Sequence, residues 1–272
     1  FEQPMEHFPS ETLLSNLVDS DKTQNPSLED IGFENNSQSI PSYRLNNELI
    51  DNYEQHRDFP AIEGTSKIGV HLRFGSISVR KAVRSALTSD NPTFLKELIW
   101  REFFMQILWH YPHTQTQSFK PQYDRIPWRN DPAEFEQWCA GNTGFPLVDA
   151  GMRELNQTGF MHNRVRMLVG SFLCKHLLID WRWGEAYFAE KLLDYEAASN
   201  IGNWQWVAGC GVDAAPYFRI FNPTSQIKKF DKDHIYIKKW VPEYSSLSYT
   251  KPMVDHPAAR QRCLEVYKSA IS

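Results

Sequence analysis

The sequence has 272 residues, a formal net charge of −4 and no run of eighteen apolar residues. This length allows one large core or two modest ones, and no membrane-crossing segment or membrane partner is expected. The slightly acidic total argues against nucleic-acid binding by bulk attraction, although a local basic surface is still compatible with it.

The cysteines are widely separated. Cys139, Cys174, Cys210 and Cys263 lie at least 35 positions apart. This spacing predicts neither a CxxC metal site nor a disulfide framework, so no metal is expected and a reducing cytoplasm fits best. The chain starts at Phe1 without a basic-then-apolar signal segment, which indicates a fragment or a processed chain.

The elements expected in chain order are helical. Residues 1–48 are rich in Asn, Ser, Glu and Pro and predict an interdomain linker, with one short helix over "ETLLSNLV" (11–18). Residues 49–272 form the folded body, where apolar residues repeat at three and four positions. No strict alternation demands a sheet, so the prediction is an all-α domain. The clearest helices are expected over 93–111, 146–159 and 163–178.

Two stretches outside these helices have loop-like sequences. The connection over 113–132 is long and contains prolines, which is typical of a functional loop. "GTSKIG" (64–69) imitates a phosphate loop, but its Lys precedes the second Gly. Since GxGxxG, HExxH and GxSxG are also absent from the sequence, nucleotide hydrolysis, zinc proteolysis and serine-hydrolase chemistry are not expected.

One helix carries an acid, an indole and a guanidinium on a single face. Glu97, Trp100, Arg101 and Phe104 lie three or four positions apart. They could form a pocket in which Trp100 stacks on a flat ligand while Glu97 bonds to its edge. They could equally be an intrahelical Glu97–Arg101 pair beside a half-buried indole.

A second face combines an amide, an arginine and a small residue. Asn163, Arg166, Met167 and Gly170 follow Gly159, which is expected to end the preceding helix. This face could receive a bulky planar group. It could equally be a buried Asn163 that caps the helix, with Arg166 paired to an acid.

A third run, residues 192–223, places acids and an amide before Trp204 and Trp206, with small residues between them. Together the three runs predict one site for a planar ligand. The sequence has nine tryptophans, which packing alone could explain and which stacking or redox chemistry would also use.

Ordered blocks over roughly residues 48–268 resemble the C-terminal, FAD-binding domain of the photolyase and cryptochrome family, specifically class I cyclobutane pyrimidine dimer photolyases. The blocks are "YEQHRDFPAIEGTSKIGVHLRFGSIS" (53–78), "KELIWREFF" (96–104), "TGFPLVDAGMRELNQTGFMHNRVRM" (143–167), "LLIDWRWGEAYF" (177–188), "NWQW" (203–206) and "DAAPYFRIFNPTSQIKKFD" (213–231). The resemblance implies a helical FAD-binding domain without the family's N-terminal α/β antenna domain, on which any antenna chromophore would be bound.

The resemblance also implies how FAD would be held. Arg166 would pair with Asp194, and Asn200 would face the flavin N5, where a neutral amide can bond to either protonation state. The phosphates would lie against Tyr53 and the segment from residue 65 to residue 69, where a helix begins. The full set of implied cofactor-binding residues is Tyr53, Thr65, Ser66, Lys67, Ile68, Gly69, Arg166, Asp194, Tyr195, Glu196 and Asn200.

The implied substrate is DNA that contains cyclobutane pyrimidine dimers. Reduced FADH⁻ would absorb blue or near-ultraviolet light and donate an electron to a flipped-out dimer, and the electron would return after the ring splits. Trp100 and Trp206 would stack on the two pyrimidines, Glu97 and Asn163 would bond to their polar edges, and Met167 would fill the gap. Flanking phosphates would contact Arg57, Arg101, Arg164 and Arg219, and Trp204, Trp181 and Trp128 would reduce an oxidised flavin by hopping.

Some positions depart from the family pattern. Gly69 stands where relatives often carry a hydroxyl, Tyr195 and Glu196 replace the common Gly and Asp, and Phe160 replaces a frequent Trp. The main alternative function is a cryptochrome-type light sensor that binds FAD without repair. A (6-4) photoproduct enzyme, for which His162 is available, and an inert binding domain are further alternatives. The protein is expected to act as a monomer.

Overall fold

The computed structural model describes residues 15–16, 25–34, 39–214 and 216–272. Contacts divide the chain into two units, Phe1–Ile40 and Pro41–Ser272, and the second unit contains the helical body. Most of the linker expected over residues 1–48 falls in the first unit, and its role stays a prediction. The short helix expected over residues 11–18 lies almost wholly outside the described residues.

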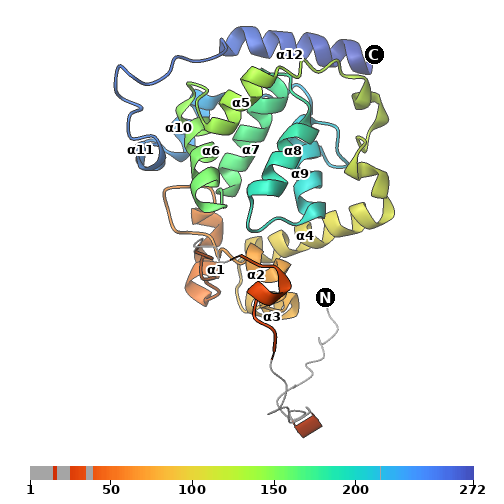
Figure 1. The fold of residues 1–272 in the computed structure, drawn as a ribbon, viewed down its shortest axis with the longest axis vertical. Helices are drawn as coiled ribbons and strands as arrows, with labels where there is room; N and C mark the ends of the chain where they lie inside the picture. Colours follow the sequence, from red (N-terminus) through yellow and green to blue (C-terminus); the bar gives the residue numbers. More distant parts are fainter. Residues whose placement is uncertain (1–14, 17–24, 35–38, 215) are drawn as a thin grey trace. The chain divides into compact units, whose positions relative to one another are not determined.

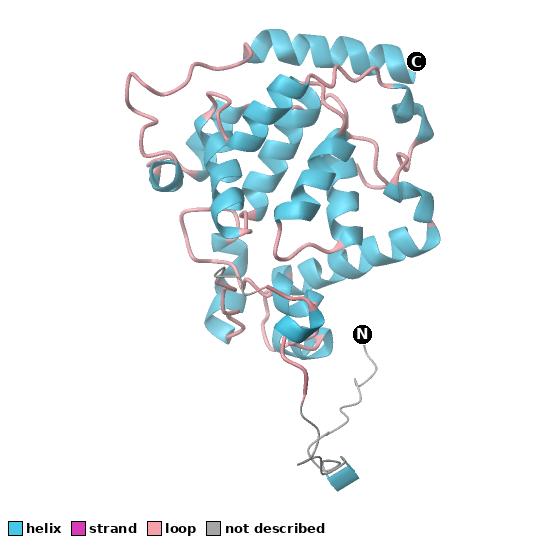
Figure 2. Cartoon of the chain, in the orientation of Figure 1, coloured by secondary structure: helices cyan, strands magenta, loops and turns pink. Residues whose placement is uncertain are grey.

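All regular elements in the described part of the chain are helices, which confirms the all-α prediction (Figure 2). None of these helices is long and apolar enough to cross a membrane. The elements are η2 (Glu29–Ile31), α1 (Asn47–His56), α2 (Gly69–Arg73), α3 (Val79–Ala86), α4 (Thr93–His110), η3 (Pro112–Gln115), η4 (Pro121–Arg125), α5 (Pro132–Ala140), α6 (Pro146–Thr158), α7 (Asn163–Ser171), η5 (Phe172–His176), α8 (Trp181–Lys191), α9 (Ala197–Ala208), α10 (Pro223–Phe230), α11 (Ile235–Trp240) and α12 (His256–Ile271).

The three clearest helix predictions are confirmed. α4 and α6 match the expected ranges, and α6 ends at Gly159, whose φ of 66° is left-handed. The helix expected over 163–178 is α7 followed directly by the π-helix η5. In η5 the Leu177 N–H donates to the Phe172 carbonyl, five residues back, at 3.2 Å.

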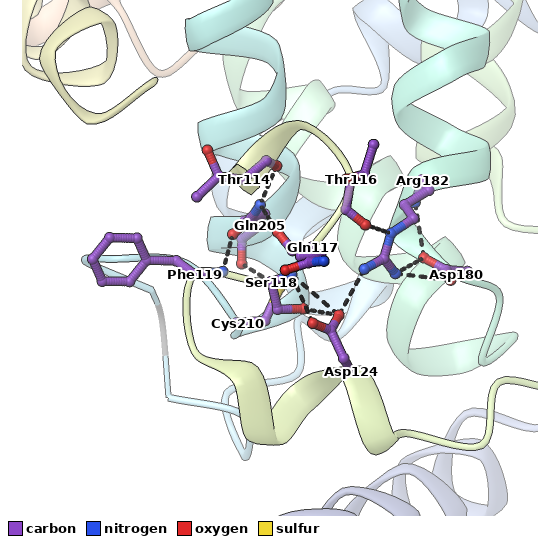
Figure 3. Close-up of polar contacts among 10 residues, drawn as sticks. All are labelled: Thr114, Thr116, Gln117, Ser118, Phe119, Asp124, Asp180, Arg182, Gln205 and Cys210. Atoms are coloured by element: carbon purple, nitrogen blue, oxygen red, sulfur yellow. Dashed lines mark hydrogen bonds and ion pairs between the residues drawn. The ribbon is translucent and has the colours of Figure 1, made fainter. Parts of the chain in front are cut away.

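The long connection after α4 is tied to the helices behind it (Figure 3). The Gln205 side chain of α9 donates to the carbonyls of Thr114 and Gln117 and accepts from the Phe119 N–H, at 2.8 to 3.0 Å. Arg182 of α8 donates to the Thr116 carbonyl. This connection includes the two short helices η3 and η4, so it is more regular than the sequence predicted.

The apolar residues form two clusters. The larger includes Trp138, Phe172 and Trp181 and is built mainly by α5 to α9, α11 and α12. The smaller includes Ile50 and Phe94 and is built by α1, α3, the start of α2 and the start of α4. α4 contacts both α9 and the α1–α3 group, so it joins the two clusters (Figure 1).

α9 is the central element of the site. It contacts α4, α7 and α8. Two glycines allow these contacts to be close, because a Cβ at Gly202 would lie 2.2 Å from the Phe104 ring, and one at Gly184 would lie 2.1 Å from the Trp204 ring. Both distances are far below van der Waals contact. α9 can therefore approach α4 and α8 this closely because Gly202 and Gly184 have no side chain.

Candidate functional site

The three polar and aromatic runs from α4, α7 and α9 meet around two cavities. We call them the Trp100 cavity and the Asn200 cavity. The Trp100 cavity has a volume of about 340 Å³. Its lining residues are Arg57, Glu97, Trp100, Arg101, Phe104, Asn163, Met167, Ser199, Asn203, Trp206 and Asp213.

The Asn200 cavity is smaller, with a volume of about 100 Å³. It shares Asn163, Met167, Ser199, Asn203 and Trp206 with the Trp100 cavity, so the two cavities are neighbours separated by these side chains. Its other lining residues are Arg166, Gly170, Phe188, Leu192, Asp194, Tyr195, Glu196, Asn200, Trp204 and Val207.

The Trp100 cavity presents indole surface to solvent. Trp100 is 42% exposed although its ring lies 5.3 Å from that of Phe103 and 6.0 Å from that of Phe104. Trp206 supplies a second indole from α9. A lining that combines two indoles with an acid and an amide suits flat rings that carry polar edges.

The Arg166–Asp194 ion pair expected from the sequence is present. Arg166 Nη2 donates to both Asp194 oxygens at 2.9 and 3.1 Å, and Arg166 Nε donates to the Met161 carbonyl at 2.7 Å. A Cβ at Gly69 would lie 3.1 Å from Asp194 Oδ2. The segment that ends at Gly69 therefore backs directly onto this carboxylate.

Asn200 is held by an acid that sequence reasoning missed. Its Nδ2 donates to the Glu185 carbonyl at 3.2 Å and to Glu185 Oε1 at 3.0 Å. Both donor hydrogens of the amide are used in this way, which leaves its carbonyl oxygen for a ligand in the Asn200 cavity. In this orientation the carbonyl oxygen is the group of Asn200 available to a ligand, and the contact with flavin N5 that the resemblance implied stays a prediction.

The expected phosphate-binding segment lines neither cavity. Ser66 is buried and its Oγ accepts from the Ile68 N–H at 3.4 Å, while Lys67 pairs with Glu63 at 2.7 Å. Tyr53 is half-buried beside Phe94, and burial, followed by the Glu97 carboxylate, raises its pKa to about 12. Thr65 is partly exposed in the same segment.

Tyr195 and Glu196 keep structural contacts despite their departure from the family pattern. The Tyr195 carbonyl accepts from Arg73 Nε at 3.1 Å, and the Glu196 carboxylate caps α9 by accepting from the N–H groups of Ala198 and Ser199. Phe160 lies under Arg166, with the guanidinium carbon 5.6 Å from the ring centre. The aromatic surface at this position is thus retained without an N–H donor.

The two alternative interpretations of the sequence are wrong about Glu97 and Asn163, although the pairing of Arg166 with an acid, which was part of the second, is confirmed. Glu97 pairs with Arg57 of the α1 C-terminus, not with Arg101 of its own helix. Asn163 is exposed, and the residue that caps α7 is His162, whose Nδ1 accepts from the Arg164 N–H at 3.2 Å. Both corrections involve partners that helical spacing cannot reveal.

His162 is unsuited to acid–base chemistry on a ligand. It is 4% exposed and lines neither cavity. Burial, followed by the charges of Arg166 and Arg164, lowers its pKa to about 4. A neutral imidazole that accepts a hydrogen bond at a helix N-terminus is a structural cap.

The tryptophans differ in their surroundings. Trp204 is buried and packs edge to face against Phe188 at 5.0 Å and Trp138 at 6.2 Å. Trp181 is buried, and Trp128 is half-buried beside Tyr267 at 6.0 Å. Trp138 was not singled out from the sequence, where nothing local distinguishes it from packing residues.

The arginines expected to contact DNA lie in three different environments. Arg57 and Arg101 line the Trp100 cavity. Arg164 lines neither cavity and pairs with Asp58, a residue that sequence reasoning also missed. Arg219 is exposed, and its carbonyl accepts from the buried Lys175 ammonium group at 2.8 Å. Asp58 is 106 positions from Arg164, so the sequence offers no local signal for this pair.

Comparisons with known proteins identify the family. A family model described as the FAD binding domain of DNA photolyase matches residues 94–248. The chain is 44% identical over 249 residues to the deoxyribodipyrimidine photo-lyase of Vibrio cholerae, an alignment that covers 82% of this chain and 53% of that protein. The chain thus spans about half the length of the curated relatives that it matches.

Solved structures agree with this result. A bacterial class III photolyase from Agrobacterium tumefaciens superposes with a TM-score of 0.77 at 41% identity, covering 82% of this chain and 53% of that one. A cryptochrome from Synechocystis superposes with a TM-score of 0.72 at 32% identity, covering 80% and 52%. With the family model matched over more than half of its residues, the chain belongs to the family of FAD binding domains of DNA photolyase.

Proposed function

We propose that this chain binds FAD and uses it, under light, to split cyclobutane pyrimidine dimers in DNA. The observation that carries the proposal is the pair of neighbouring cavities. One has a volume of about 340 Å³ and is lined by two indoles, and the other is bordered by a fixed ion pair and a fixed amide. The relatives named as photo-lyases support the same activity.

The residues around the Asn200 cavity fit a flavin. Arg166 and Asp194 offer a donor and an acceptor at one edge, Asn200 offers a carbonyl oxygen, and Phe188 and Val207 offer apolar surface. FAD in its reduced form FADH⁻ supplies the light-driven electron when bound. The chain's own part is to hold the ring edge, exclude water and keep the ring beside the Trp100 cavity. Any antenna pigment is proposed to bind outside this helical body.

The residues around the Trp100 cavity fit a flipped-out dimer. Trp100 and Trp206 stack on its rings, Glu97 and Asn163 bond to its polar edges, and Met167 fills the space between them. A dimer is poorly stacked in the duplex and flips at lower cost than a normal base pair, which gives selectivity without sequence reading. Arg57, Arg101, Arg164 and Arg219 are proposed to contact the flanking phosphates.

The Trp100 cavity also makes the cryptochrome-type sensor the weaker alternative. A cryptochrome-type sensor needs the flavin cavity but has no evident use for an open cavity with two indoles and an acid beside it. The (6-4) alternative is weaker because His162 is buried and neutral. The protein is proposed to act as a monomer, and Trp204, Trp181 and Trp128 remain the proposed electron donors to oxidised flavin.

The experiment that tests the proposal removes one wall of the Trp100 cavity. Trp100→Ala combined with Glu97→Ala should slow light-dependent loss of thymine dimers by at least about tenfold, since stacking on one base contributes about 1–3 kcal/mol. Dimer loss in an oligonucleotide is measured under illumination with a reductant, with flavin content read from absorbance.

The matched control changes the same residue types on the same helix, as Trp109→Ala with Glu102→Ala. Trp109 is 80% exposed and neither residue lines the cavity. The control should repair at the wild-type rate. Wild-type repair by the Trp100 and Glu97 double variant, at unchanged flavin content, would remove the cavity from the mechanism.

A further inference from the structure

Four charged residues form a line beside the Trp100 cavity. Arg164 of α7 donates from Nη2 to Asp58 Oδ1. The same Asp58 oxygen lies 4.0 Å from Arg57 Nε, and Arg57 Nη1 donates to Glu97 Oε1. Charges therefore alternate along the line, with one carboxylate shared between two arginines.

The line is electrically balanced and open to solvent. Two positive and two negative groups cancel, and their side chains are between 21% and 34% exposed. An anionic oxygen between two guanidinium groups is also the arrangement in which arginines hold a phosphodiester. Asp58 thus presents to the two arginines the kind of anionic oxygen that a DNA phosphate also carries.

Arg164 already has one anionic partner, and its other contacts are to an aromatic ring and a sulfur. Its guanidinium carbon lies 4.6 Å from the centre of the Phe230 ring, and Nη1 lies 3.7 Å from the Met167 sulfur. Its Nε is buried without a hydrogen-bond partner among the described residues. The Nη2 group is its strong ionic donor, and Asp58 already uses it. A phosphate that approaches this side of Arg164 competes with the carboxylate and is repelled by its charge.

We propose that Asp58 competes with the phosphates of DNA for Arg164 and Arg57. This competition lowers the affinity for undamaged DNA and so increases the preference for the lesion. The inference rests on the proposed function, because it takes DNA as the ligand. An undamaged duplex offers only phosphates in exchange for Asp58. Damaged DNA also fills the Trp100 cavity, and those added contacts offset the competition.

The test is Asp58→Asn, which removes the charge and keeps the shape. Its affinity for an undamaged labelled duplex, measured in the dark by fluorescence anisotropy over a range of salt concentrations, should rise roughly fivefold at low salt. The slope of log K against log salt concentration should steepen by about 0.9, the value for one more neutralised phosphate. The ratio of affinities for damaged and undamaged DNA should fall.

The control is Glu54→Gln, which removes one negative charge from an exposed position on α1 and should leave the salt slope unchanged. Asp58→Ser serves as a second neutral variant if Asp58→Asn folds poorly, and it should show the same rise. An unchanged or weaker affinity for undamaged DNA in the neutral variants that fold overturns the proposal, since Asp58 would then only orient the arginines. Failure of the wild-type protein to prefer damaged DNA would instead contradict the proposed function.

Discussion

Asn200 shows how a neighbour decides what a side chain can do. An amide alone offers a donor and an acceptor, and the sequence could not say which one faces a ligand. Glu185 lies fifteen positions away and takes both donor hydrogens. The acceptor oxygen is then the available group, and its orientation is set before any ligand binds.

This contact predicts the behaviour of Asn200→Asp. The new carboxyl group would stand against Glu185, so one of the two acids would become protonated and its pKa would rise above its value in the unfolded chain. Stability is then complete at low pH and is lost as pH rises through the raised pKa. The destabilisation relative to wild type should be larger at pH 7.5 than at pH 5 by about 1–2 kcal/mol, measured by urea unfolding.

The control for this variant is Asn203→Asp on the same helix. Asn203 is exposed and its Nδ2 donates to the Ser199 carbonyl, so its substitution brings no carboxylate against Glu185. Its destabilisation should not grow with pH. Parallel pH profiles for the two variants would show that the Asn200 amide nitrogen does not face Glu185.

The residues of the candidate site could be predicted individually, but their partners could not. Helical spacing correctly grouped Glu97 with Trp100, since both positions lie on one turn of α4. It also suggested Arg101 as the partner of Glu97, whereas the structure pairs Glu97 with Arg57, 40 positions earlier. Contacts between helices depend on packing, which periodicity within one helix does not encode.

At the scale of elements, Gln205 explains why a polar residue separates two tryptophans in "NWQW". It is 2% exposed and joins α9 to the connection after α4 through three hydrogen bonds. α9 carries Trp206 and α4 carries Trp100, so this connection helps to fix the two indoles relative to each other.

Gln205→Leu should therefore lower the free energy of unfolding by roughly 2–4 kcal/mol, because it leaves buried main-chain groups without partners. Urea unfolding followed by circular dichroism measures the change. Gln106→Leu is the matched control, since Gln106 is exposed on α4 and bonds only within its helix, to Glu102. A loss below about 1 kcal/mol for Gln205→Leu would show that water replaces these bonds.

Helix ends were predictable where a residue fixes the backbone. α6 begins with Pro146 and stops at Gly159, and both signals are local. The change from α7 to the π-helix η5 had no such signal, because "SFLCKH" contains neither Gly nor Pro. The two short helices in the connection over 113–132 were likewise missed, as their order depends on Gln205 and Arg182 from distant helices.

At the scale of the whole molecule, two buried histidines couple folding to pH. Burial lowers the pKa of His162 to about 4 and that of His176 to about 3. In the unfolded chain a histidine has a pKa near 6.5. The unfolded state therefore takes up protons between about pH 6.5 and pH 4 while the folded state does not, and stability falls as pH falls through this window.

His162→Asn should flatten that pH dependence, since Asn can cap α7 and does not titrate. Wild-type His162 costs about 2 kcal/mol of stability at pH 5 relative to pH 8, so the variant should lose that much less on acidification. The charged groups that act on His162 are Arg164, Arg166, Arg57, Asp58 and Glu154, and none of them is changed. Unfolding free energies at pH 8 and pH 5 give the difference directly.

Glu154 changes stability with pH in the direction opposite to His162. The quantity to compare is therefore the difference in unfolding free energy between wild type and His162→Asn at each pH. Burial raises the pKa of Glu154, so its contribution to stability increases as pH falls. This contribution is common to wild type and His162→Asn and cancels when their profiles are subtracted. His110→Asn, at an exposed position on α4, should keep the wild-type profile. A His162→Asn profile that parallels the wild type would mean that the imidazole takes up its proton over the same pH range in the folded and the unfolded chain, and the cap on α7 would then need another acceptor below that range.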